Sequence, residues 1–272
     1  MKDAFEVAAV VPAAAAVGNA GAGVASLKPS FVYGLHAVNA IIERAPERLL
    51  ELWLAESRDD SRMRELKQRA QVVGVRAQIV STEALGKRVQ DVSHQGVVAA
   101  VRALHPWDEK NLMAALSKLD VDPLLLVLDG VTDPHNLGAC LRTADAVGVH
   151  ALIIPKDRAA AVDGVVRKVA AGAAEFVPVA TVTNLARTLD ALKNIGIWVV
   201  GTDDQADQTL YAADLKRPLA VVLGAEGGGM RRLTRERCDF LVRIPMAGWT
   251  TSLNVAVAAG VVLFEAGRQR MG

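Results

Sequence analysis

Residues 124–154 read LLLVLDGVTDPHNLGACLRTADAVGVHALII, and this stretch decides the fold class. Residues 124–128 are a continuous apolar run of strand length, 137–147 have helical periodicity, and 151–154 are a second apolar run. Strands this apolar are buried on both faces, as in a parallel sheet that helices cover. The stretch therefore predicts an α/β fold with a parallel sheet.

The same alternation continues toward the C-terminus. Strand-like runs lie at 176–180, 197–200, 219–223 and 241–244, and helical patterns lie at 165–170, 184–194 and 253–266. Ligands of parallel sheets bind beyond the carboxyl ends of the strands. We therefore expect a functional site in the loops that follow residues 128, 200, 223 and 244.

The N-terminal part predicts a smaller α/β unit over 31–103. It has helical patterns at 35–42 and 61–73, and strand-like runs at 52–55, 75–80 and 97–101. A polar, turn-prone stretch follows, so we predict a linker over 104–121 and a second domain over 122–272.

Residues 1–30 contain an Ala/Val run that Pro12 interrupts, too short for a membrane helix. A secretory signal is one interpretation of this run. However, Asp3 and Glu6 oppose the positive start that a signal needs. A disordered or expression-derived extension is therefore the favoured interpretation.

The overall charge and the metal-binding residue types exclude several classes. The 272 residues carry 31 Lys+Arg and 30 Asp+Glu, a net charge of +1, so the chain is not a bulk polycation. Any nucleic-acid site must then come from local arrangement. Cys140 and Cys238 form no CxxC pair and the five histidines show no ligand spacing, so we expect no metal. Sparse cysteine also suits a reducing cytoplasm.

The first candidate loop runs from Asp133 to Gly138 and leads into a helix that contains Arg142. We predict Asn136 as the N-cap, which places Arg142 less than two turns inside the helix. Free N–H groups at a helix N-terminus, with an Arg nearby, suit a phosphate or carboxylate. Ordinary capping beside a solvated Arg142 is the alternative.

The second candidate loop is GAEGGG at 224–229, directly after an apolar strand. Its spacing is not GxGxxG, and no Lys-Ser/Thr pair follows it, so neither a dinucleotide loop nor a P-loop is indicated. Its glycines allow a ligand to approach the backbone closely. A flexible turn with Glu226 at the surface is the alternative.

The third candidate loop runs from Ile244 to Asn254 and precedes a helix that is apolar nearly all round. We predict Ser252 as its N-cap and Asn254 within its first turn. Such a helix is buried, and polar groups that it delivers need partners. The pattern therefore favours a site.

Taken together, the three loops resemble the motifs of the SPOUT-class (TrmH-type) RNA 2'-O-ribose methyltransferases. Asn136-x-Gly138-x-x-x-Arg142 is similar to the first motif, and residues 223–230 to the second. Ile244-Pro245-Met246 with residues 252–255 is similar to the third. Within the family, residues 33–38, 94–96 and 129–136 resemble the bacterial 23S rRNA (guanosine-2'-O)-methyltransferases. Residues 249–251, Trp-Thr-Thr, depart from the small and hydroxylated residues often found there.

The resemblance implies a fold and a reaction. The fold is a C-terminal domain with a deep trefoil knot and an N-terminal, ribosomal-protein-like RNA-binding domain. The reaction is 2'-O-methylation of a guanosine in the peptidyl-transferase P loop of 23S rRNA, in the cytoplasm. S-adenosylmethionine is the methyl donor, no metal takes part, and a homodimer carries the active site at its interface.

The resemblance also implies roles for particular residues. The functional polar positions are Asn136, Arg142, Glu226, Ser252 and Asn254. The positions that hold S-adenosylmethionine, largely through backbone contacts, are Gly224, Ile244 and Leu253. Two roles for Arg142 stay open, deprotonation of the 2'-hydroxyl or binding of the adjacent phosphate. A tRNA 2'-O-methyltransferase and a non-catalytic RNA-binding assembly factor are the alternative functions.

Overall fold

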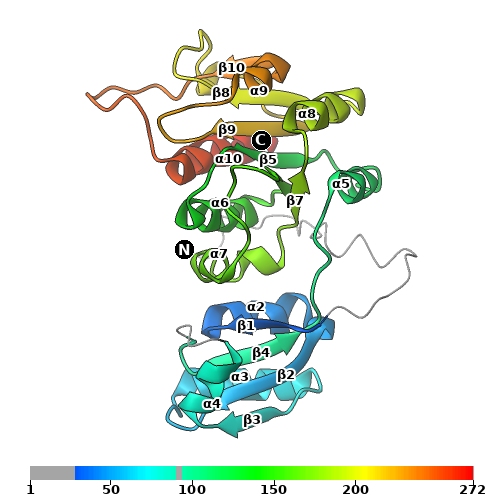
Figure 1. Cartoon of the computed structure of the whole chain (residues 1–272), viewed down its shortest axis with the longest axis vertical. Helices are drawn as coiled ribbons and strands as arrows, with labels where there is room; N and C mark the ends of the chain where they lie inside the picture. Colours follow the sequence, from blue (N-terminus) through cyan, green and yellow to red (C-terminus); the bar gives the residue numbers. More distant parts are fainter. Residues whose placement is uncertain (1–27, 90–93, 272) are drawn as a thin grey trace. The chain divides into compact units, whose positions relative to one another are not determined.

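The computed structural model describes residues 28–89 and 94–271, which form two compact units (Figure 1). The smaller unit ends at His105 and the larger begins at Pro106. The extension predicted over 1–30 lies outside the described residues up to residue 27. No helix of the described part of the chain is both long and apolar enough to cross a bilayer.

The smaller unit is a four-stranded sheet with helices. Its strand order is β1-β4-β2-β3, and β4 pairs antiparallel with β1 and β2 while β3 pairs parallel with β2. The strands are β1 (Ser30–Tyr33), β2 (Leu49–Ala55), β3 (Ala77–Val80) and β4 (Val97–Val101). The helices are α2 (Leu35–Arg44), α3 (Ser61–Val72) and α4 (Thr82–Arg88).

The larger unit is built on a six-stranded, wholly parallel sheet of order β10-β8-β9-β5-β6-β7. This confirms the predicted parallel sheet. The strands are β5 (Leu124–Asp129), β6 (Ala151–Pro155), β7 (Val179–Val182), β8 (Trp198–Thr202), β9 (Leu219–Gly224) and β10 (Phe240–Val242).

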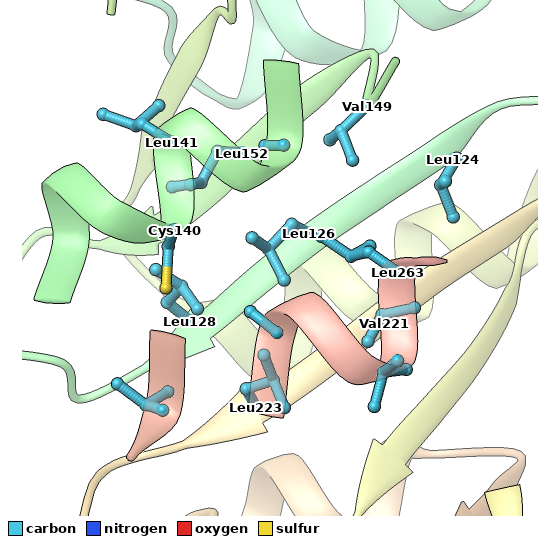
Figure 2. Close-up of a cluster of buried hydrophobic side chains, with 14 of the residues drawn as sticks. Leu124, Leu126, Leu128, Cys140, Leu141, Val149, Leu152, Val221, Leu223 and Leu263 are labelled. Carbon is cyan, nitrogen blue, oxygen red and sulfur yellow. The ribbon is translucent and has the colours of Figure 1, made fainter. Parts of the chain in front are cut away.

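Two apolar clusters cover the two faces of this sheet. Alternate residues of a strand point to opposite faces, and every residue of β5 is buried. On one face Leu126 and Leu128 pack with α6 (Pro134–Val147) and α10 (Val255–Met271) (Figure 2). The helix α7 (Gly164–Val169) joins the same cluster. On the other face Leu125 and Val127 pack with α5 (Glu109–Leu116) and α8 (Leu185–Asn194), and α9 (Arg232–Arg237) lies beside α8.

Several predicted boundaries differ from the structure. The stretch predicted as a linker contains α5, whose Leu112 is buried in the core of the larger unit. The strand predicted at 176–180 starts too early, because Phe176 follows the 3-10 turn Ala173–Glu175 and Pro178 has no N–H to donate. The elements β1, α4 and α9 were not predicted from the sequence.

Candidate functional site

The candidate site lies along the carboxyl edge of the larger sheet. Because β5, β8, β9 and β10 run parallel, the loops that follow them emerge at this same edge. All three candidate loops of the sequence analysis are among them.

The first loop is capped differently from the prediction. Asp133 is the N-cap of α6, and its Oδ1 accepts the His135 N–H at 2.9 Å. The prediction of Asn136 as N-cap is therefore wrong, because the helix begins at Pro134. Arg142 is then the ninth helical residue, in the third turn instead of the first two. Its side chain is exposed and has no ion pair or hydrogen bond among the described residues.

Gly138 of the first motif is a packing residue. A Cβ at this position would lie 2.7 Å from the Cβ of Val169 and 2.9 Å from the carbonyl oxygen of Val166. Real Cβ contacts are not this close, so only glycine lets α6 lie against α7. The glycine of this motif thus positions the helix that carries Arg142.

The second loop closes on itself over Gly224. The Gly229 N–H donates to the Ala225 oxygen at 2.9 Å, and the Ala225 N–H donates back at 3.1 Å. A Cβ on Gly224 would lie 2.0 Å from the carbonyl carbon of Gly229. Position 224 therefore has no room for a side chain. Glu226 is exposed at the tip and pairs with no described residue.

A buried carboxylate that the sequence analysis missed fixes the end of this loop. Asp129, at the end of β5, is 1% exposed, and its Oδ2 accepts the Arg231 N–H at 2.8 Å. Its Oδ1 accepts from the Nε of Arg231 at 2.5 Å. The sequence feature that could have indicated this residue is an acidic side chain directly after the apolar run 124–128. Its partner lies 102 residues away in the sequence.

The third loop meets the first through a pair of asparagines. The Nδ2 of Asn254 donates to the Oδ1 of Asn136 at 2.9 Å, across 118 residues of sequence. The Oδ1 of Asn254 accepts the Ala256 N–H at 2.9 Å, so Asn254 caps α10. The prediction of Ser252 as N-cap is wrong, because the helix begins only at Val255. Two of the five predicted polar residues are thus in direct contact.

The start of the third loop is also held in place. One guanidinium nitrogen of Arg243 donates to the carbonyl oxygens of Ala206 and Asp207 at 2.6 and 2.5 Å. These carbonyls belong to the loop after β8. Ile244 and Leu253 are half-buried, whereas every residue from 245 to 252, including Ser252, is exposed. The loop therefore projects between two fixed ends.

Cations without ion pairs lie around α6 and α7. Arg142, Lys156, Arg158 and Lys168 are exposed and pair with no described residue. The loop with Lys156 and Arg158 is tied to the segment between β5 and the first candidate loop, because the Ala160 N–H donates to the Val131 oxygen at 2.9 Å. By contrast, the arginines at 231, 232, 235 and 237 are all in ion pairs. This local excess of unpaired positive charge suits a polyanion.

The residues present argue against nucleophilic cysteine chemistry. Burial raises the pKa of both the Cys140 and Cys238 thiols to about 12, so both stay protonated at neutral pH. In the described residues no three His, Cys, Asp or Glu side chains gather as a metal site would require.

Known proteins share both units of the chain. The SpoU rRNA methylase family matches residues 123–264, and the RNA 2'-O ribose methyltransferase substrate binding family matches residues 31–107. The structure is similar to the SpoU methyltransferase AviRb from Streptomyces viridochromogenes in complex with the cofactor AdoMet. The two structures superpose with a TM-score of 0.70 at 28% sequence identity, over 90% of this chain and 91% of the AviRb chain.

Two curated relatives match nearly from end to end. The 23S rRNA (guanosine-2'-O-)-methyltransferase RlmB of Pectobacterium atrosepticum is 54% identical over 241 residues, which is 89% of this chain and 98% of the relative. The protein of the same name from Pseudomonas aeruginosa is 56% identical over 239 residues, 88% of this chain and 96% of the relative. With its fold, its site and these matches taken together, the chain belongs to the SpoU rRNA methylase family.

Proposed function

We propose that the chain transfers a methyl group from S-adenosylmethionine to the 2'-hydroxyl of a guanosine in the peptidyl-transferase P loop of 23S rRNA. The observation that carries the proposal is the Asn254–Asn136 hydrogen bond of 2.9 Å. It joins the first and third motifs at the carboxyl edge of the larger sheet, where the glycine loop 224–229 also lies. The names of relatives more than half identical to the chain support the same reaction and rRNA.

The cofactor is assigned to Gly224, Ile244 and Leu253. All three are half-buried: Gly224 ends β9, Ile244 follows β10 by two residues, and Leu253 lies just before α10. The AviRb structure in complex with AdoMet supports this choice of cofactor. Bound S-adenosylmethionine supplies the methyl group on a positively charged sulfur.

The residues of the chain have to orient the ribose and assist loss of the hydroxyl proton. The exposed guanidinium of Arg142 binds the phosphate beside the ribose and lowers the pKa of the 2'-hydroxyl. An arginine is very hard to deprotonate, so this role is preferred to that of a base. Glu226 is exposed on the second loop and Ser252 on the third, and both contact the ribose. Asn136 and Asn254 hold the first and third loops together.

A second copy of the chain completes the proposed enzyme. Val257, Val261 and Phe264 follow each other at helical spacing on α10, and Val257 and Phe264 are 52% and 53% exposed. Val261 packs partly against the core, whereas Val257 and Phe264 leave about half of their surface uncovered, which suits a homodimer with the active site near the interface. Phe264→Glu should lower the molar mass measured by light scattering to that of a monomer. An unchanged mass would contradict this interface.

The family resemblance also carries the finer features of the fold. We propose the trefoil knot because the chain returns from the edge strand β10 to pack α10 against α6 and β9. The smaller unit is proposed as a ribosomal-protein-like domain that binds the rRNA in the cytoplasm. As a complete α/β unit, it favours an rRNA substrate over tRNA, because the bacterial tRNA enzyme typically has short helical extensions instead.

The test is to incubate the protein with S-adenosylmethionine labelled in its methyl group and with 23S rRNA or tRNA. We expect label at one guanosine of the 23S P loop, mapped by the block that a 2'-O-methyl group places on alkaline hydrolysis. Label in tRNA alone would support the tRNA alternative. Binding of rRNA without any label would support the assembly factor.

A further inference from the structure

Two tryptophans of the larger unit are exposed, and they differ in what surrounds them. Trp198, at the start of β8, is 42% exposed, and its ring is contacted by the guanidinium of Arg217 at 4.3 Å and by the ring of Phe240 at 6.4 Å. Trp249 is fully exposed, and no described aromatic ring or cation stacks on it. Both faces of the Trp249 ring are therefore available.

Trp249 is held close to the proposed ribose-binding residues. It lies in the third loop, whose ends are fixed by the hydrogen bonds of Arg243 and Asn254. Ser252 is three positions further along the chain, and an extended chain spans at most about 3.5 Å per residue. The Cα atoms of Trp249 and Ser252 are therefore within about 11 Å of each other.

The surroundings of Trp249 favour a nucleobase over a protein surface. Its neighbours in the loop are Gly248, Thr250 and Thr251, so it is an isolated aromatic side chain among small and hydroxylated residues. The core of a protein interface would need a continuous apolar patch. Unstacked bases of an RNA loop instead stack on single aromatic side chains, and hydroxyl groups can bind the adjoining sugar and phosphate.

We infer that Trp249 stacks on a base of the RNA substrate next to the methylated ribose and so helps to select the target nucleotide. This rests on the proposed function, since it requires RNA at the carboxyl edge. Trp249 acts as a positioning residue. It takes no part in the transfer itself.

The first experiment measures tryptophan fluorescence while a 23S rRNA fragment with the P loop is added. Stacking on a base quenches the Trp249 emission, so the native chain should show a fall in intensity that Trp249→Phe lacks. Trp198→Phe is the matched control, because it removes an exposed tryptophan from the opposite edge of the sheet. This control should keep the quenching.

The second experiment separates binding of RNA from chemistry. Trp249→Ala should raise the KM for the fragment about 10-fold, within the range expected for loss of one stacked base. Its affinity for S-adenosylmethionine, measured by calorimetry, should stay unchanged. Phenylalanine can still stack, so Trp249→Phe should restore most of the lost affinity for the fragment.

Three results would overturn the inference. One is an unchanged KM in Trp249→Ala, and another is RNA quenching that persists in Trp249→Phe. The third is a Trp249 emission that changes on dilution of the protein and not with RNA, which would assign the ring to a partner subunit. Failure of the native chain to methylate any RNA would instead refute the proposed function itself.

Discussion

Gly224 and Gly228 belong to one loop but leave different amounts of space. A Cβ on Gly224 would clash with the returning backbone at 2.0 Å, whereas a Cβ on Gly228 would meet nothing within 4 Å. Gly224→Ala should therefore deform the loop, cost about 1–3 kcal/mol of stability and weaken S-adenosylmethionine binding at least about 10-fold. Gly228→Ala is the control, and it should change stability by less than about 0.5 kcal/mol. Calorimetry measures the affinity for S-adenosylmethionine, and thermal unfolding measures the stability of each variant. Equal cofactor affinities of the two variants would contradict the assignment of Gly224 to the cofactor site.

Arg142 tests the proposed division between cofactor binding and catalysis. Arg142→Ala should reduce methyl transfer by at least about 100-fold, because it removes a charge proposed to act in the transition state. Binding of S-adenosylmethionine should persist, since the guanidinium has no hydrogen bond or ion pair with a described residue of the cofactor loops. Lys118→Ala removes another exposed charge, beside α5, and serves as the control. Loss of cofactor binding in a folded Arg142→Ala protein would refute this role.

At the scale of elements, the sequence predicted the strands better than the helix starts. An apolar run of only five residues, as at 124–128 between Pro123 and Gly130, is short for a helix and therefore indicates a strand. The first and third loops each contain more than one residue that can cap a helix, and intrinsic preference hardly separates them. The Asn254–Asn136 hydrogen bond, together with the Ala256 N–H, makes Asn254 the cap instead of Ser252. A contact between distant segments determines the N-cap of α10, so the local sequence pattern could not predict it.

The beginnings of β5 and β6 are joined by a histidine whose charge matters. His150 is buried, and its Nδ1 accepts the Leu124 N–H at 3.1 Å, so this nitrogen must be unprotonated. Burial lowers the pKa of His150 below its usual 6.5, and the charge of Arg270 acts in the same direction. The unfolded chain therefore takes up the proton first as the pH falls. The stability that this histidine contributes is complete above pH 6.5 and decreases below it.

The variant His150→Asn tests this dependence. An asparagine oxygen can accept the same Leu124 N–H but does not titrate. Between about pH 7.5 and pH 5.5 the midpoint of thermal unfolding should therefore fall less in His150→Asn than in the native chain. Parallel curves for the two proteins would show that His150 does not contribute to the acid sensitivity.

At the scale of the whole molecule, the sequence predicted the division into two units. It did not predict that the boundary between them lies between His105 and Pro106. The change from a mixed to a strictly alternating pattern after residue 123 marks the larger sheet. The short helix α5 looks like part of a linker in the sequence, because only eight residues carry its pattern. Its assignment to the larger unit comes from the burial of Leu112 and Leu116 in the apolar cluster on one face of the sheet, which requires the folded sheet.

The two units are expected to separate RNA binding from methyl transfer. The larger unit has its own continuous core on both faces of its sheet, so a chain of residues 106–272 should fold and keep its cofactor site. RNA affinity comes mainly from phosphate contacts, each of which adds to the salt dependence of binding. Removal of residues 1–105 should therefore weaken binding of a 23S rRNA fragment at least about 10-fold and flatten its dependence on salt. Filter binding over a range of salt concentrations measures both quantities, and S-adenosylmethionine calorimetry on the same sample checks that the larger unit is intact. A truncated protein that binds the cofactor and methylates the fragment with the KM of the full chain would show that the smaller unit only stabilises the fold.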